Sequence, residues 1–200
     1  MKNNLLSDKL AYNGDTKTRT HLHLCSYTVD RVEEAAGDDF GEMKSRFQPD
    51  GITWLQIHGL EDTDAVQTVC THFGIDFLVM QDILNTDHAS KVEEHDQYNV
   101  IIAKQIMGGE AMQVSLVQGA DFVLTFQERD NDFFDDVMRA IRNNVLKIRT
   151  RQSDYLFSVL LNGLITGYMS VAAAISDGLE ELESALLADT GDRDIGVQMQ

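Results

Sequence analysis

Hydrophobic residues recur in blocks along the chain, and their spacing predicts strands in some blocks and helices in others. Residues 52–57 are apolar on both faces, which predicts a central strand that is buried from both sides. Residues 98–107, 112–117 and 122–126 predict three further strands joined by short, glycine-containing turns. Connections of this length favour antiparallel pairing of neighbouring strands.

The N-terminal part predicts one more strand and a short helix. Residues 21–29 are rich in β-branched and aromatic side chains, and the apolar positions change from one face to the other at Cys25. This change of parity predicts a bulge within the strand. Asp30 and Glu33 then have capping-box spacing, which predicts that a short helix begins there.

Apolar residues at helical spacing predict several other helices before residue 150, three of which are described first. The first lies within residues 40–47 and ends ahead of the only proline, Pro49. The second begins after Asp62 as its cap, and the third begins at Asp132. A basic run follows, which we interpret as dipole compensation and solvated charge rather than an anion site; it contains Arg139, Arg142, Lys147, Arg149 and Arg151.

The stretch of residues 73–93 predicts the end of one helix and a short second one. Gly74 suits the left-handed position after a helix, and Asp76 is expected to accept the first free amide protons of the next helix. The apolar side chains of this second helix are three and four positions apart and are expected to face the core, and they are Phe77, Met80 and Leu84.

Gln81 and Asp82 are expected to point away from that core. Asp82 lies near the helix C-terminus, where the macrodipole slightly disfavours a carboxylate unless a cation offsets it. This makes Asp82 a candidate cation ligand. The alternative is an ordinary solvated acidic residue.

Residues 155–176 contain no charged side chain, and a stretch of this length is long enough to cross a bilayer. The stretch also holds Gly163 and Gly167 at the spacing of packed membrane helices. Against a membrane span stand several hydroxyl and amide side chains and a heptad stripe that continues into the charged region beyond Asp177. We therefore expect a long helix packed along another helix. Gly191 is expected to interrupt the pattern before a further helix begins.

Together these elements predict an α/β fold of the α+β type. Its mixed, largely antiparallel sheet is covered by helices in an α/β/α arrangement and is followed by a long C-terminal helix. We expect a flexible arm over residues 1–20, the core of the domain over residues 21–152, and the long helix with the start of a further helix over residues 153–200.

Composition narrows the classes of function. A formal net charge of −17 and a pI near 4.5 argue against a partner bound through its phosphate backbone, so no nucleic acid is expected. Cys25 and Cys70 form neither a disulfide framework nor a Cys-x-x-Cys site, and the N-terminus lacks the apolar region of a secretory signal. We therefore expect the chain on the cytosolic side. No catalytic motif appears, so no enzyme is predicted.

Two groups of residues carry potential metal ligands. His21 and His23 place two imidazoles on one face of a strand, but no third ligand can be identified from the sequence. We therefore favour a structural role for this pair. Polar residues near the predicted hairpin also include ligand types, which a solvent-exposed tip explains equally well; they are Asp87, His88, Glu93, Glu94, His95 and Asp96.

Several short strings, in order and spacing, resemble the cytosolic domain of the CorA family of magnesium and cobalt transporters, over roughly residues 52–187. The strings are Trp54, Gly59-Leu60, Phe73-Gly74-Ile75, Asp82-Ile83-Leu84, Lys91-Val92-Glu93, Val114-Ser115-Leu116, Phe126-Gln127-Glu128 and Asp154-Tyr155-Leu156. The long stalk helix, the two membrane helices and the Gly-Met-Asn pore motif of the family are missing. The chain is therefore expected to be a soluble piece of a longer transporter.

The resemblance implies a homopentamer in the cell (inner) membrane whose cytosolic domains bind Mg²⁺ at subunit interfaces and thereby hold the pore closed. Asp82 matches the family's interfacial acidic position. Its usual acidic neighbour is Gln81 here, and its acidic partner on the stalk is missing, so Mg²⁺ is expected to bind the isolated chain weakly or not at all. A second family site needs acidic residues near residues 162–167, which this chain lacks.

Two alternatives stay open. One is a zinc-transporting relative with a similar cytosolic domain. The other is a stand-alone cytosolic α/β binding module that shares only the fold. The continuation of the reading frame and an ion-selectivity assay distinguish these possibilities.

Overall fold

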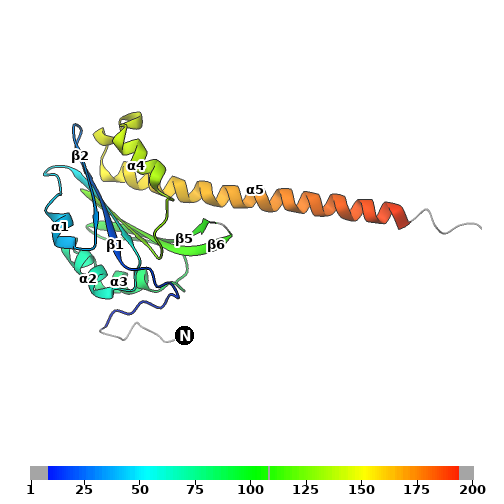
Figure 1. Ribbon diagram of the computed structural model, residues 1–200, viewed down its shortest axis with the longest axis horizontal. Helices are drawn as coiled ribbons and strands as arrows, with labels where there is room; N and C mark the ends of the chain where they lie inside the picture. The colour runs from blue at the N-terminus through cyan, green and yellow to red at the C-terminus, as the bar shows by residue number, and fades with distance from the viewer. Residues whose placement is uncertain (1–8, 108, 194–200) are drawn as a thin grey trace, which may run out of the picture.

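A seven-stranded sheet lies between two layers of helices, and one long helix extends away from it (Figure 1). The computed structural model describes residues 9–107 and 109–193. The strand order is β2-β1-β3-β7-β6-β5-β4. The strands are β1 (His21–Tyr27), β2 (Val32–Gly37), β3 (Ile52–His58), β4 (Lys91–Glu94), β5 (Tyr98–Met107), β6 (Glu110–Gly119) and β7 (Phe122–Gln127).

Every neighbouring pair of strands is antiparallel except β3 and β7, which are parallel. This confirms the predicted mixed, largely antiparallel sheet. The central strand β3 is buried along Thr53 to His58, as its two-sided apolar pattern predicts. Successive side chains of β3 enter opposite cores, because Trp54 packs with one helical layer and Leu55 with the other.

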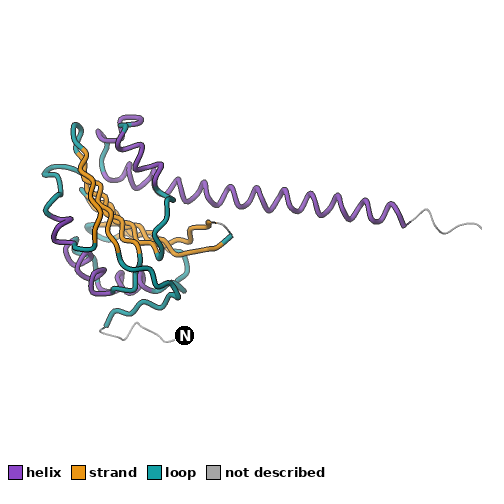
Figure 2. The backbone as a smooth tube through the Cα atoms, in the orientation of Figure 1, coloured by secondary structure: helices purple, strands orange, loops and turns teal. Residues whose placement is uncertain are grey.

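Helices lie on both faces of the sheet (Figure 2), and the two layers divide by sequence (Figure 1). One face of the sheet packs against α1 (Phe40–Lys44), α2 (Thr63–His72) and α3 (Phe77–Leu84). The other face packs against α4 (Asp135–Arg142), the 3₁₀ segment η2 (Val145–Thr150) and the start of α5 (Ser153–Arg193). The predicted α/β/α layering with a long C-terminal helix is therefore confirmed.

Helix α5 is packed only over its first part. Leu156, Leu160 and Leu164 are buried against the sheet. Gly163 and Gly167 face the ring of Phe133 rather than a second helix, at a distance that would also admit a Cβ. The Tyr168 hydroxyl still donates to the carbonyl oxygen of Lys104 on β5, and beyond Tyr168 the helix runs clear of the sheet (Figure 1).

The apolar stripe further along α5 lies in the open. Ile175, Leu179 and Leu182 are 59 to 63% exposed. Among the described residues, only Ser153–Leu187 is long and apolar enough to cross a membrane, on length and composition alone. Gly191 lies inside α5, so it does not interrupt the helix at that position. The further helix predicted after Arg193 falls on residues 194–200, outside the described residues.

Two predictions near the N-terminus are wrong. Residues 32–37 form strand β2 rather than a helix, because Thr28 and Arg31 close a hairpin turn that returns the chain along β1. Strand β1 has no bulge, since its pairing with β2 and with β3 is continuous. The change of parity at Cys25 instead marks the point where both faces of β1 become buried.

Candidate functional site

The helix that carries Asp82 is positioned by features that the sequence predicts only in part. Gly74 has a φ of +68° directly after α2, as expected for a residue that ends a helix. Asp76 occupies the N-cap position of α3 but makes no capping bond. Its carboxylate instead accepts a 2.7 Å hydrogen bond from the Tyr98 hydroxyl, and burial raises the pKa of Tyr98 to about 12, so this donor stays protonated.

Gln81 is only 6% exposed, so the expectation that it points away from the core is wrong. The other buried residues of α3 are Val79, Met80, Ile83 and Leu84. At 3.6 residues per turn, these five side chains spread over about 200° of the helix surface. Only Leu78 and Asp82 lie together on the remaining outward arc, where Leu78 is 58% exposed.

Asp82 is paired with a cation from the neighbouring strand. The Lys91 ammonium lies 2.5 Å from Asp82 Oδ2 and 2.8 Å from Glu93 Oε1. His88 Nε2 lies 3.3 Å from Asp82 Oδ1. The Asp82 and Lys91 side chains are only 18% and 21% exposed, so water screens their interaction incompletely. This ammonium is the cation that offsets a carboxylate at a helix C-terminus.

The titration behaviour of the group follows from these contacts. Burial alone lowers the pKa of Lys91, but its hydrogen bonds to Asp82 and Glu93 outweigh burial and leave the pKa raised. The hydrogen bond from Lys91 is also the main reason why the pKa of Glu93 is lowered. These interactions therefore favour the charged forms of Lys91 and Glu93.

Two side chains from distant parts of the chain fix the last turn of α3. Gln113 on β6 donates from Nε2 to the carbonyl oxygens of Asp82 and Ile83, at 3.3 and 3.0 Å. Asn13 accepts a 2.7 Å hydrogen bond from the backbone N–H of Thr86 in the following loop. The bonds from Gln113 satisfy carbonyl groups that the C-terminus of a helix leaves free, and the bond to Asn13 anchors the loop that follows, so the position of Asp82 is well defined.

Asp82 and its partners line an open hollow of about 800 Å³. Its lining includes carboxylates, two imidazoles and an apolar rim, and comprises Asp76, Phe77, Leu78, Val79, Asp82, His88, Lys91, Glu93, Glu94 and His95. Carboxylate oxygens suit a hard cation such as Mg²⁺, which binds through oxygen ligands and retained water. In a single chain Lys91 already pairs with the two best placed carboxylates, so a cation has to displace it or bind around it.

The structure brings together most of the polar residues predicted near the hairpin. His88, Glu93, Glu94 and His95 line the same hollow as Asp82. Asp87 lies instead beside Asn13, with its carboxylate 3.4 Å from the Asn13 amide nitrogen.

The predicted basic run does not form one surface site. Arg142 makes two hydrogen bonds, at 2.6 and 2.5 Å, to the carboxylate of Glu34 on β2. Arg139 pairs with Asp136 one turn before it in α4, and Arg151 stacks over the ring of Tyr155.

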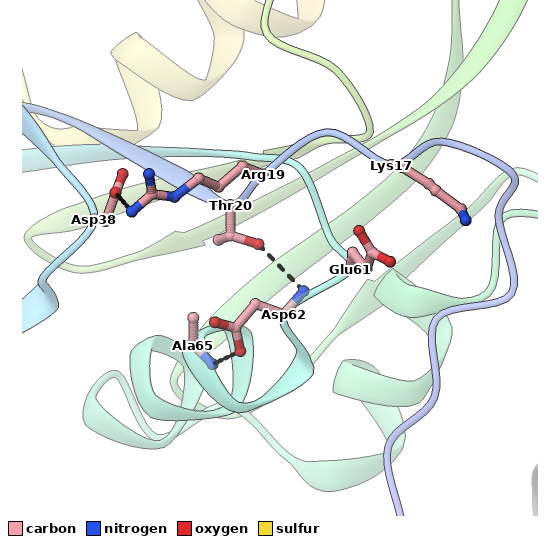
Figure 3. A pocket seen from close by; sticks show the side chains of 7 residues that line it. All are labelled: Lys17, Arg19, Thr20, Asp38, Glu61, Asp62 and Ala65. Atoms are coloured by element: carbon pink, nitrogen blue, oxygen red, sulfur yellow. Dashed lines mark hydrogen bonds and ion pairs between the residues drawn. The ribbon is translucent and has the colours of Figure 1, made fainter.

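A second, smaller hollow of about 410 Å³ lies between residues 17–20 and the start of α2 (Figure 3). Its polar groups largely serve the fold. Arg19 pairs with Asp38, the Thr20 hydroxyl accepts from the backbone N–H of Asp62, and the Asp62 carboxylate caps α2 through the N–H of Ala65. This confirms Asp62 as the cap of α2. The polar groups of this hollow therefore connect residues 17–20 to α2 and to Asp38.

Sequence reasoning missed one convergence of ligand types. His23 lies close to His58 at the end of β3 and to Asp130 just after β7, with ligand atoms within 4.8 Å of one another. The parallel pairing of β3 with β7 brings these residues together. The sequence does hold a signal for part of this group. His58 and Asp130 each follow a predicted apolar strand, and the C-terminal ends of two parallel strands meet at one edge of the sheet.

Comparison with known proteins identifies the family. A sequence profile described as CorA-like Mg²⁺ transporter protein matches residues 49–198. This chain belongs to the CorA family. The cobalt/magnesium transport protein CorA of Thermotoga maritima is 32% identical over 192 residues, which cover 93% of this chain and 55% of that protein. The chain thus spans about half the length of this curated CorA relative.

Solved structures share the fold at lower identity. The complete CorA magnesium transporter of Methanocaldococcus jannaschii matches with a TM-score of 0.60 and 19% identity, over 84% of this chain and 51% of that one. Full-length CmaX matches with a TM-score of 0.65 and 11% identity, over 88% and 54%. The ZntB cytoplasmic domain of Vibrio parahaemolyticus matches with a TM-score of 0.56 and 10% identity, over 80% and 64%.

Proposed function

We propose that this chain is the cytosolic regulatory domain of a CorA-like divalent-cation transporter and that it senses Mg²⁺ at interfaces between subunits. The observation that carries the proposal is the outward carboxylate of Asp82, in an acid-lined surface hollow of a CorA family member. Mg²⁺ is both the regulatory ion and a transported ion, and Co²⁺ is a second transported ion. No catalytic role is proposed.

Asp82 supplies one part of the regulatory site. Within one subunit its charge is balanced by Lys91, so Mg²⁺ binds this chain weakly. Carboxylates from a neighbouring subunit add enough negative charge for a hydrated Mg²⁺ to be held between the two. The ion then favours the closed assembly through its higher affinity for that assembly, and loss of the ion lets the subunits move apart.

Two further features fit this proposal: an exposed apolar stripe that suits assembly with other subunits, and a negative net charge that attracts cations. The exposed stripe on α5 offers Ile175, Leu179 and Leu182 for packing against helices of other subunits. We propose a homopentamer that is anchored in the cell (inner) membrane by a segment beyond this chain, with this domain on the cytoplasmic side. The net charge of −17 raises the local concentration of cations near the domain.

A zinc-transporting relative with the same cytosolic domain is the second candidate. The ZntB cytoplasmic domain shares this fold at a TM-score of 0.56, so the fold alone does not separate the two candidates. Transport assays on the full-length protein separate the candidates, since a CorA-like protein carries Mg²⁺ whereas a zinc transporter carries Zn²⁺ and leaves Mg²⁺ behind.

The regulatory role is tested by limited proteolysis of the full-length protein at increasing Mg²⁺. Asp82→Ala is expected to require more Mg²⁺ for protection than the unaltered protein. Asp64→Ala, which removes an exposed carboxylate from α2, is the matched control and is expected to behave like the unaltered protein. Unchanged protection in Asp82→Ala would remove Asp82 from the regulatory site.

A further inference from the structure

Three imidazoles lie in a row on the face of the sheet that packs against α4. His21 and His23 project from β1, and His58 projects from the end of β3. His21 pairs directly with His58 in the register, so all three side chains share one face. The ring centroids of His21 and His23 are 4.7 Å apart, and those of His23 and His58 are 5.1 Å apart.

A carboxylate completes this group at its open side. Asp130 follows β7, which pairs in parallel with β3, so Asp130 and His58 emerge at the same edge of the sheet. His58 Nδ1 lies 3.4 Å from Asp130 Oδ1. Two ligands of a tetrahedral Zn²⁺, each about 2.0 to 2.1 Å from the metal, are about 3.4 Å apart. This pair is therefore already at the spacing that one metal ion requires.

The ring of His23 has a nitrogen without another partner among the described residues. His23 Nε2 is buried and has no hydrogen-bond partner among the described residues. A buried nitrogen without a partner loses its hydration without compensation, so its retention calls for a physical explanation. Ligand atoms of His23, His58 and Asp130 all lie within 4.8 Å of one another, so small side-chain rotations close the set around an ion.

We propose that His23, His58 and Asp130 form a binding site for a transition-metal cation such as Zn²⁺ or Co²⁺, separate from the Asp82 hollow. Two imidazole nitrogens and one carboxylate oxygen are a ligand set that these borderline metals prefer. Mg²⁺ favours all-oxygen ligands and gives up water reluctantly, so the site selects against it. Three protein ligands leave a fourth position for water.

The surroundings favour a bound cation. Asp130 and Asp135 add negative charge close to His23. His21 Nδ1 is held by the carboxylate of Asp38 at 2.7 Å, so His21 borders the site without being needed as a ligand. Metal binding would replace the 3.3 Å contact between His58 Nδ1 and the carbonyl of Arg129.

The test is titration of the purified chain with Co²⁺ and Zn²⁺, by calorimetry and by the visible absorption of bound Co²⁺. One tight Co²⁺ site with tetrahedral absorption is expected, and millimolar Mg²⁺ should not displace the ion. His23→Gln and Asp130→Asn should each weaken binding by at least about tenfold. Asp130 is 61% exposed, so its substitution leaves the fold intact, whereas the deeply buried His58 is left unaltered.

Matched controls separate this site from other ligands on the chain. Asp132→Asn removes the same charge two residues away and is expected to leave Co²⁺ affinity unchanged, as is His72→Gln on α2. The double variant His88→Gln/His95→Gln removes both imidazoles from the Asp82 hollow and should retain the tight site.

Any of four results would overturn the proposal. The first is the absence of a tight Co²⁺ site in the unaltered chain, and the second is unchanged Co²⁺ affinity in His23→Gln and Asp130→Asn. The third is loss of Co²⁺ binding in the double variant His88→Gln/His95→Gln, and the fourth is displacement of bound Co²⁺ by Mg²⁺. None of these results bears on the role proposed for Asp82, which involves different residues and a different ion.

Discussion

Replacing Lys91 with methionine tests whether the Lys91 ammonium stabilises the hollow around Asp82 and competes there with Mg²⁺. The substitution keeps most of the length of the side chain and removes the ammonium that lies 2.5 Å from Asp82 and 2.8 Å from Glu93. Exposed ion pairs contribute about 0.2 to 1 kcal/mol, and breaking fully buried ones costs about 3 to 5 kcal/mol. With side chains 18% and 21% exposed, the Asp82–Lys91 pair lies between these limits, at about 1 to 2 kcal/mol.

Lys91→Met should therefore have two opposite effects. Without divalent cations, the free energy of unfolding should fall by about 1 to 2 kcal/mol, because Asp82 and Glu93 lose their shared counter-charge. In the unaltered chain Mg²⁺ must displace the ammonium at a similar cost. Removing it should therefore raise Mg²⁺ affinity by about 5- to 30-fold, at 1.4 kcal/mol per factor of ten.

The assay is urea unfolding of the chain across a series of Mg²⁺ concentrations. Binding of Mg²⁺ to the folded state raises stability with the logarithm of its concentration, so the midpoint of this rise reports affinity. Lys44→Met, which removes an exposed lysine from α1, is the matched control and should shift neither quantity. A loss of stability without any gain in Mg²⁺ affinity would refute the competition between Lys91 and Mg²⁺.

Two further predictions concern the backbone and the buried histidines. Gly59→Ala should destabilise more than Gly74→Ala, because both residues have positive φ but an added Cβ meets the carbonyl oxygen of Thr18 at 2.4 Å only at Gly59. Urea unfolding of the two variants checks this order, and equal losses would contradict it. Burial lowers the pKa of the half-buried His23 and of the buried His58, so the unfolded chain binds protons at these rings more readily, and metal-free stability should fall as pH drops below about 6.5. Asp130 partly opposes the lowered pKa of both rings, and Asp135 that of His23. Unfolding of the metal-free chain at pH 7.5 and 5.5 measures the loss of stability, which His23→Gln should reduce; an unaltered loss in that variant would contradict the role of His23.

The sequence predicts the elements whose signal is local. The two-sided apolar pattern of β3 and the cap at Asp62 both depend on residues close in the chain, and the structure confirms them. The capping-box spacing of Asp30 and Glu33 is equally local but misleading, because pairing of residues 32–37 with β1 outweighs helix propensity.

The candidate site shows why local patterns are insufficient. Asp82 could be predicted as an outward carboxylate from helical spacing, but its pairing with Lys91 depends on where β4 lies relative to α3. Helical spacing places Gln81 on the solvent side of α3, but this residue is buried, because α3 buries more of its surface than one apolar stripe indicates. His58 and Asp130 approach His23 only through the register of β1, β3 and β7, which no local spacing reveals.

The most direct test of the regulatory function is ion flux through the full-length protein in liposomes as a function of Mg²⁺ on the cytosolic side. Mg²⁺ should inhibit flux through the unaltered protein. Asp82→Ala should need a clearly higher Mg²⁺ concentration for the same inhibition, while Asp64→Ala should match the unaltered protein. Equal sensitivity to Mg²⁺ in all three proteins would contradict the assignment of this domain as a sensor that acts through Asp82.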